Sequence, residues 1–167
     1  MLIQKEEPFS IVVGLPNSLW KFKRLNAFVV GCFIFHNKNE TLRDDIVKHE
    51  LVHINQFYRH PFKQPFGYLT NANRRLEYEC EAYAKQILFL LHKDYDIDNF
   101  DLFLGIESFK VLIDSFSNVI YTSYKLNMDE SICRDRLLHA VKKATTEYRI
   151  NVELYNDIPF WADGGSI

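Results

Sequence analysis

The sequence predicts a single α+β domain, residues 1–167, in which a small N-terminal β-sheet packs on a mainly helical body. Runs rich in valine, isoleucine and phenylalanine lie within the first 40 residues and are bounded by turn-forming residues, as strands are. Beyond residue 40 the apolar residues recur every three or four positions, as they do in amphipathic helices. The aromatic content of 15%, with 14 Phe and 9 Tyr, predicts a core rich in rings.

The composition excludes several classes of protein. With 47% apolar and 25% charged residues, the chain resembles neither a disordered segment nor a disulfide scaffold. A net charge of −2 provides no basic field for nucleic acid. Cys32, Cys80 and Cys133 are odd in number and lack a paired spacing, which favours reduced thiols and a cytoplasmic location. The longest apolar run, Leu25–Phe35, is too short to cross a bilayer, so we expect no membrane association.

Two strands are expected before residue 40. The first covers Phe9–Val13 and is closed by the turn-forming residues Gly14–Asn17. The second covers Ala27–Phe35, whose valine, isoleucine and phenylalanine residues are typical of a buried strand.

A helix is predicted over Leu42–Arg59. Thr41 and Asp44 have the spacing of a capping box, and Pro61 is expected to end the helix. Residues 61–70 contain two prolines and a glycine and are predicted to form a loop.

Further helices are predicted over residues 73–93, 109–120 and 133–144, because apolar side chains recur there at helical spacing. Asp129 is expected to cap the last of these helices. The residues from Ile150 onward are predicted to include a short strand and a tail.

The chemically informative segment is His-Glu-Leu-Val-His, within the first predicted helix. His49 and His53 are four residues apart, so their imidazoles project from one face, one turn from each other. Two ring nitrogens in this arrangement can reach one Zn²⁺ at about 2.0–2.1 Å. Glu50 follows the first histidine, where its carboxylate can act as the general base for a water molecule on the metal.

A catalytic zinc ion needs a third protein ligand, which we expect from the next helix. Glu79 borders the apolar face of that helix, where a carboxylate is costly unless it is paired or binds a metal. Glu81 is the alternative ligand, although it shares a more polar face with Glu77. His60 is not favoured, because it stands one residue away from the position that the metzincin pattern requires.

This layout resembles that of the gluzincin-type zinc metallopeptidases, which combine a His-Glu-x-x-His helix with a glutamate from a following helix. The string Glu79-Cys80-Glu81-Ala82 is similar to their Glu-x-x-Ala-Asp signature, except that Tyr83 stands where the family carries an aspartate. The string His49–Gln56 is similar to that of small predicted metallopeptidases of bacteria and bacteriophages. The resemblance covers about residues 27–92 and implies a peptide or protein substrate.

The expected activity is therefore zinc-dependent hydrolysis of peptide bonds. Zn²⁺ would activate water, Glu50 would move its proton, and Tyr68 or Tyr83 would donate to the developing oxyanion. Two other readings stay open. One is a catalytically inactive zinc-binding structural or interaction protein of phage or bacterial origin. The other is a metal-free helical binding module.

Overall fold

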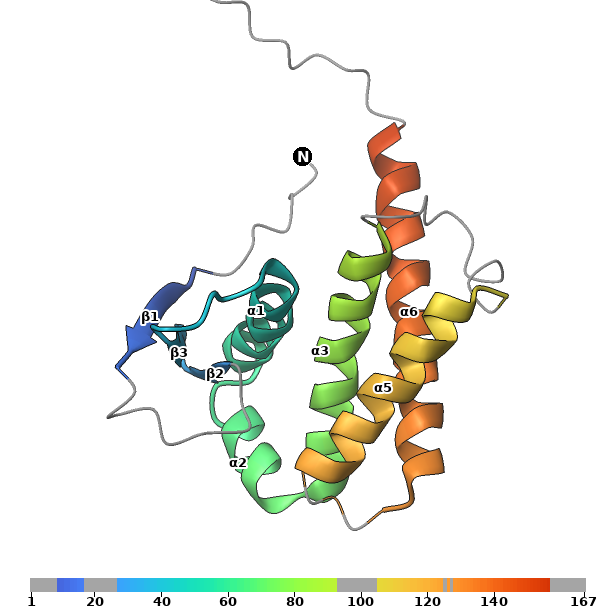
Figure 1. Cartoon of the computed structure of the whole chain (residues 1–167). Helices are drawn as coiled ribbons and strands as arrows, with labels where there is room; N and C mark the ends of the chain where they lie inside the picture. The colour runs from blue at the N-terminus through green and yellow to red at the C-terminus, as the bar shows by residue number, and fades with distance from the viewer. Residues whose placement is uncertain (1–8, 17–26, 93–104, 125, 127, 157–167) are drawn as a thin grey trace, which may run out of the picture.

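The computed structural model describes residues 9–16, 27–92, 105–124, 126 and 128–156. This part of the chain contains a short three-stranded sheet followed by helices, which confirms the predicted α+β fold (Figure 1). The elements are β1 (Ile11–Leu15), β2 (Ala27–Val30), β3 (Phe33–Asn37), α1 (Asp44–Arg59), α2 (Lys63–Thr70), α3 (Ala72–His92), α5 (Glu107–Ser123) and α6 (Glu130–Asn156).

The strands form a sheet of order β1-β3-β2, in which β1 runs parallel and β2 antiparallel to β3. The prediction of one strand over Ala27–Phe35 was wrong, because a tight turn at Gly31 and Cys32 divides this run into the hairpin of β2 and β3. Gly31 has a φ of 62°, a left-handed conformation that glycine adopts without strain. The hairpin places the fully buried Ile34 on the central strand.

Helix α1 begins at Asp44 and ends at Arg59, close to the predicted range. The predicted capping box was wrong: Arg43 is the N-cap residue, and no side-chain hydrogen bond caps the helix. Asp44 and Asp45 lie in the first turn, where their negative charges interact favourably with the helix dipole.

Residues 63–70 are helical as α2, so the prediction of a loop over residues 61–70 was wrong. Pro65 is the third residue of α2, and the first-turn N–H groups of a helix have no partner within the helix. A proline there costs no hydrogen bond, which is why it does not prevent the helix from forming.

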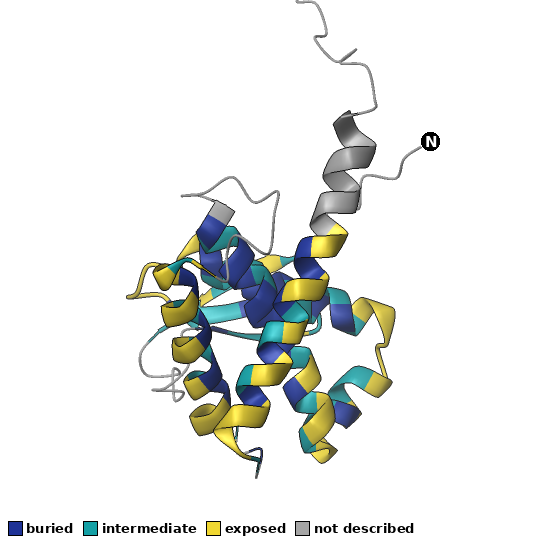
Figure 2. Cartoon of the chain, turned by 90° about the vertical axis from the view of Figure 1, so that its right-hand side faces the viewer, coloured by how far each residue is buried: buried dark blue, intermediate teal, exposed yellow. Residues whose placement is uncertain are grey.

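Helices α3, α5 and α6 form a bundle that contains most of the core (Figure 1). The buried residues lie on the inward faces of these helices and the exposed ones on the outer faces (Figure 2). Helix α3 matches its predicted range to within one residue at each end. Helix α6 begins directly after Asp129 and continues to Asn156, so the strand predicted after Ile150 was wrong where the structure describes these residues.

Helix α1 lies between the sheet and the helical bundle (Figure 1). Its Leu51 and Ile54 pack against Ala27 and Ile34 of the sheet in a second, smaller core cluster. Its opposite face turns toward α3, and the candidate site forms there. Among the described helices, none has the length and apolar character needed to cross a membrane.

Candidate metal centre

Helix α1 turns a line of polar side chains toward α3. Asp45, His49, His53 and Gln56 are spaced by four, four and three residues, so they lie on one helical face. Each contacts a polar group of α3, and we call these four residues the polar seam. The seam joins α1 to α3 through hydrogen bonds and ion pairs, whereas the other face of α1 packs on the sheet through apolar contacts.

One end of the polar seam is structural. Gln86 of α3 donates to Asp45 Oδ2 at 2.7 Å, and Arg43 donates to both carboxylate oxygens of Asp45 at 2.9 and 2.7 Å. Burial alone would raise the pKa of Asp45, but the hydrogen bonds from Arg43 and Gln86 and the Arg43 charge outweigh burial and lower it. Both carboxylate oxygens of Asp45 therefore accept hydrogen bonds, from Arg43 and Gln86.

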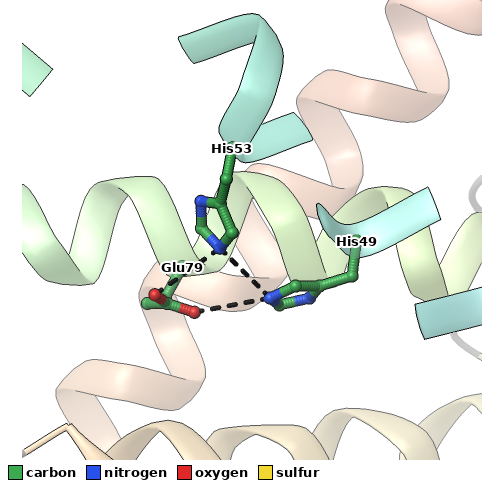
Figure 3. A group of neighbouring side chains, drawn as sticks. All are labelled: His49, His53 and Glu79. Atoms are coloured by element: carbon green, nitrogen blue, oxygen red, sulfur yellow. Dashed lines mark hydrogen bonds and ion pairs between the residues drawn. The ribbon is translucent and has the colours of Figure 1, made fainter. Parts of the chain in front are cut away.

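The middle of the seam brings together His49, His53 and Glu79, as Figure 3 shows. The Nε2 atoms of the two histidines are 3.2 Å apart. Glu79 Oε2 lies 3.6 Å from His49 Nε2, and Glu79 Oε1 lies 3.6 Å from His53 Nε2. In the part of the chain that the structure describes, this is the only group of three or more metal-ligating side chains with its ligand atoms close together.

These separations suit a tetrahedral metal ion. Ligand atoms about 2.0–2.1 Å from a tetrahedral Zn²⁺ are about 3.3–3.4 Å from one another, close to the spacing of the two Nε2 atoms and the carboxylate. The two Nε2 atoms face each other, and Glu79 Oε2 is buried without a hydrogen-bond donor among the described residues. A buried carboxylate oxygen without a donor and two converging imidazoles are a set of groups that a cation would satisfy.

Without a metal, the cluster carries its own compensating charge. Burial alone would lower the pKa of His53, but the charge of Glu79 and the hydrogen bonds around the ring raise it to about 9. Burial alone would raise the pKa of Glu79, but the charges and contacts of His53 and His49 hold it far below its ordinary value. At neutral pH the metal-free cluster is therefore a buried ion pair between an imidazolium and a carboxylate.

Glu50 is also buried, with 6% of its surface exposed. Burial raises the pKa of Glu50, an effect that the charge of Glu79 reinforces and the charges of His49 and His53 oppose. Glu50 is thus coupled electrostatically to all three residues of the cluster.

The two tyrosines predicted as donors occupy different positions. Tyr68, on α2, donates its O–H to Glu79 Oε1 at 2.5 Å, and burial together with the Glu79 charge raises its pKa so that it stays protonated. Tyr83, on α3, packs its ring against the His49 ring, with centroids 4.3 Å apart, and its hydroxyl lies 3.3 Å from that of Tyr124. The Tyr68 hydroxyl therefore contacts the cluster, whereas Tyr83 contributes its ring.

Glu81, the alternative third ligand, lies outside the cluster. Its carboxylate accepts from Arg59 at 2.7 Å and from Gln56 at 2.8 Å. His60 is exposed at the C-cap of α1. Of the two carboxylates that the sequence offered, the structure brings only Glu79 to the histidines.

Reasoning from the sequence missed the two ends of the polar seam, Asp45 with Gln86 and Gln56 with Glu81. A signal was present, because Asp45 stands four residues before His49 and Gln56 three residues after His53, spacings that keep all four on the same helical face. The partners on α3 could not be read in the same way, since they depend on how the two helices pack.

No family model, curated protein or solved structure matches this chain.

Proposed function

We propose that this chain is a zinc-dependent hydrolase that cleaves peptide bonds. The observation that carries the proposal is the buried group of His49, His53 and Glu79, with Glu50 coupled to it. Two imidazoles and one carboxylate are the protein ligands of many catalytic zinc sites, which keep a further position for water or substrate.

The residues of the chain would divide the chemistry between them. A bound Zn²⁺ supplies Lewis-acid polarisation of a carbonyl and lowers the pKa of water to near 7. Glu50 would accept the proton of the attacking water on its carboxylate and deliver it to the leaving amine. Tyr68, whose single O–H donates to Glu79 Oε1 in the metal-free structure, would turn that O–H to the oxygen on which negative charge develops.

Strand β2 offers a place for an extended substrate. It is an edge strand of the described sheet and packs beside α1, the helix that carries both histidines. A peptide could add to this edge through backbone hydrogen bonds.

The second candidate is a zinc-binding protein without catalysis. It is favoured by the surroundings of His49, whose buried Nδ1 has no hydrogen-bond partner among the described residues and whose ring packs against Tyr83 rather than a carboxylate. Histidines at zinc sites usually donate their second ring N–H to a partner that orients them.

The test compares Glu50→Gln with the wild type and with Glu77→Gln, which changes an exposed carboxylate of α3. Zinc content is measured after purification without chelator, and cleavage is measured on a mixture of quenched fluorescent peptides. We expect about one zinc ion in all three proteins, and cleavage reduced about 10²–10⁴-fold in Glu50→Gln alone. Bound zinc with equal cleavage in the three proteins would refute the role of Glu50. Zinc without cleavage in any of them would favour the non-catalytic candidate, and absence of zinc would favour the metal-free module.

A further inference from the structure

Gln56 is a buried side chain beside the candidate metal centre whose amide has three hydrogen-bond partners. It is 2% exposed and lies on α1, three residues after His53. Its Oε1 is 2.9 Å from His53 Nδ1, and its Nε2 donates to the Tyr78 carbonyl oxygen at 3.1 Å and to Glu81 Oε2 at 2.8 Å. Three partners therefore surround one buried amide.

These partners determine which way the amide points. The NH₂ group has two donors, and the structure offers it two acceptors, the Tyr78 carbonyl and the Glu81 carboxylate. In the reverse orientation the amide oxygen would face both acceptors and the NH₂ group would face the His53 ring. The reverse orientation is therefore excluded, and Gln56 Oε1 is the atom that faces His53. Because this oxygen can only accept, His53 donates from Nδ1, and the His53 Nε2 atom faces His49 and Glu79.

Glu81 is itself held from the other side. Its Oε1 accepts from Arg59 at 2.7 Å while its Oε2 accepts from Gln56. Arg59, Glu81, Gln56 and His53 thus form a hydrogen-bonded chain that crosses from α1 to α3 and back. Glu81, which the sequence offered as an alternative ligand, thus supports His53 through these hydrogen bonds. His49 has no such support, because its Nδ1 has no partner among the described residues.

We propose that Gln56 is a positioning residue that holds His53 with its Nε2 directed at the metal, and that Glu81 anchors Gln56 for this purpose. The inference rests on the proposed zinc site, and it adds a residue that determines the affinity of that site. Partners of this kind fix the tautomer and orientation of a ligand histidine, and their loss typically weakens metal binding 10–100-fold.

The main test measures zinc affinity and the free energy of unfolding for Gln56→Met and Gln86→Met. Both glutamines are buried and join α1 to α3, but Gln86 contacts Asp45 and no ligand histidine. Both variants should lose a similar amount of stability in chelator. Only Gln56→Met should lose zinc affinity, by about 10–100-fold, whereas Gln86→Met should stay within about threefold of the wild type.

A rescue variant separates positioning from packing. The double change Gln56→Glu with Glu81→Gln exchanges the amide and the carboxylate. Position 56 still accepts from His53, whereas the hydrogen bond across the helices is reversed, because Glu81 accepts from Gln56 in the wild type and the new amide at position 81 would donate to the new carboxylate at position 56. We expect the zinc affinity of this double variant to be within about fivefold of that of the wild type. It should also exceed the affinity of Gln56→Met, because the acceptor for His53 is kept.

A spectroscopic readout uses the wild type alone, so it does not depend on whether a variant folds. Long-range ¹H–¹⁵N NMR of the zinc-loaded protein should show His53 bound through Nε2 with a proton on Nδ1. Coordination through Nδ1, equal zinc affinity in Gln56→Met and the wild type, or an equal loss in Gln86→Met would each overturn the inference. A wild type that binds no zinc would instead refute the proposed function, so the two failures are distinguishable.

Discussion

Zinc binding to this chain should depend steeply on pH, because the metal must displace a proton from His53. In the metal-free structure His53 Nε2 lies 3.6 Å from Glu79 Oε1, and the pKa of His53 is raised to about 9. A histidine must lose the proton on its ligating nitrogen to bind a metal, so each ion should release about one proton near pH 7.

The size of the effect follows from the raised pKa. For a pKa of about 9, the deprotonated fraction of His53 grows roughly 80-fold between pH 6.5 and 8.5, and apparent zinc affinity should rise by the same factor. A histidine with an ordinary pKa near 6.5 would give only about a twofold rise over this range. The two cases are therefore easily separated.

The assay is competition with a chromophoric chelator across this pH range. Calorimetry in two buffers with different ionisation enthalpies then gives the number of protons released. As a control, Glu79→Gln removes the charge that raises the His53 pKa, so proton release near pH 7 should fall by close to one proton per ion even though zinc binds more weakly. An affinity that changes threefold or less in the wild type, with no proton released, would refute this reasoning.

The same ion pair determines how the stability of the metal-free protein changes with pH. The pKa of His53 is higher in the folded state, so its stabilising contribution is complete below about pH 6.5 and is lost as the pH rises through about 9, an effect of at most about 3 kcal/mol. The pKa of Glu79 is lower in the folded state, so its contribution is present above about pH 4.5 and is lost as the pH falls. In chelator, unfolding by denaturant should therefore show alkaline destabilisation, opposite in sign to the trend of zinc affinity.

Two further pairs of variants test a hydrogen bond at the site and the core of the helical bundle. Tyr68→Phe removes the donor to Glu79 Oε1 and should destabilise the metal-free protein by about 1–3 kcal/mol in denaturant unfolding, whereas Tyr58→Phe, at a half-exposed position, should change stability by less than about 0.5 kcal/mol. Equal effects of the two changes would contradict the buried hydrogen bond. Ile87→Ala, at a fully buried position of α3, should lower the free energy of unfolding by about 2–5 kcal/mol, whereas Ile132→Ala, at an exposed position of α6, should lower it far less. Thermal unfolding of both variants would show whether the bundle contains most of the core.

The helices and the two histidines could be predicted from the sequence because the relevant information is local. Helical periodicity predicted α1 and α3 nearly to their observed ends, and four-residue spacing placed His49 and His53 on one face. The failures were also local in origin. The hairpin turn at Gly31 lies inside a continuous apolar run, which predicted one strand instead of two. The prolines of residues 61–70 predicted a loop where α2 forms.

The sequence by itself determined an α+β domain and a helix with two imidazoles on one face, together with a glutamate at the edge of the apolar face of the following helix. Only the tertiary structure decided that Glu79 meets the histidines while Glu81 turns to Arg59 and Gln56. Glu79 and Glu81 are two positions apart on α3, so their side chains point in directions that differ by about 200° around the helix axis. The packing of α3 on α1 therefore brings one carboxylate to the cluster and directs the other away. No spacing within a single segment encodes that choice, because it depends on the relative rotation of two helices fixed by the core on either side of them.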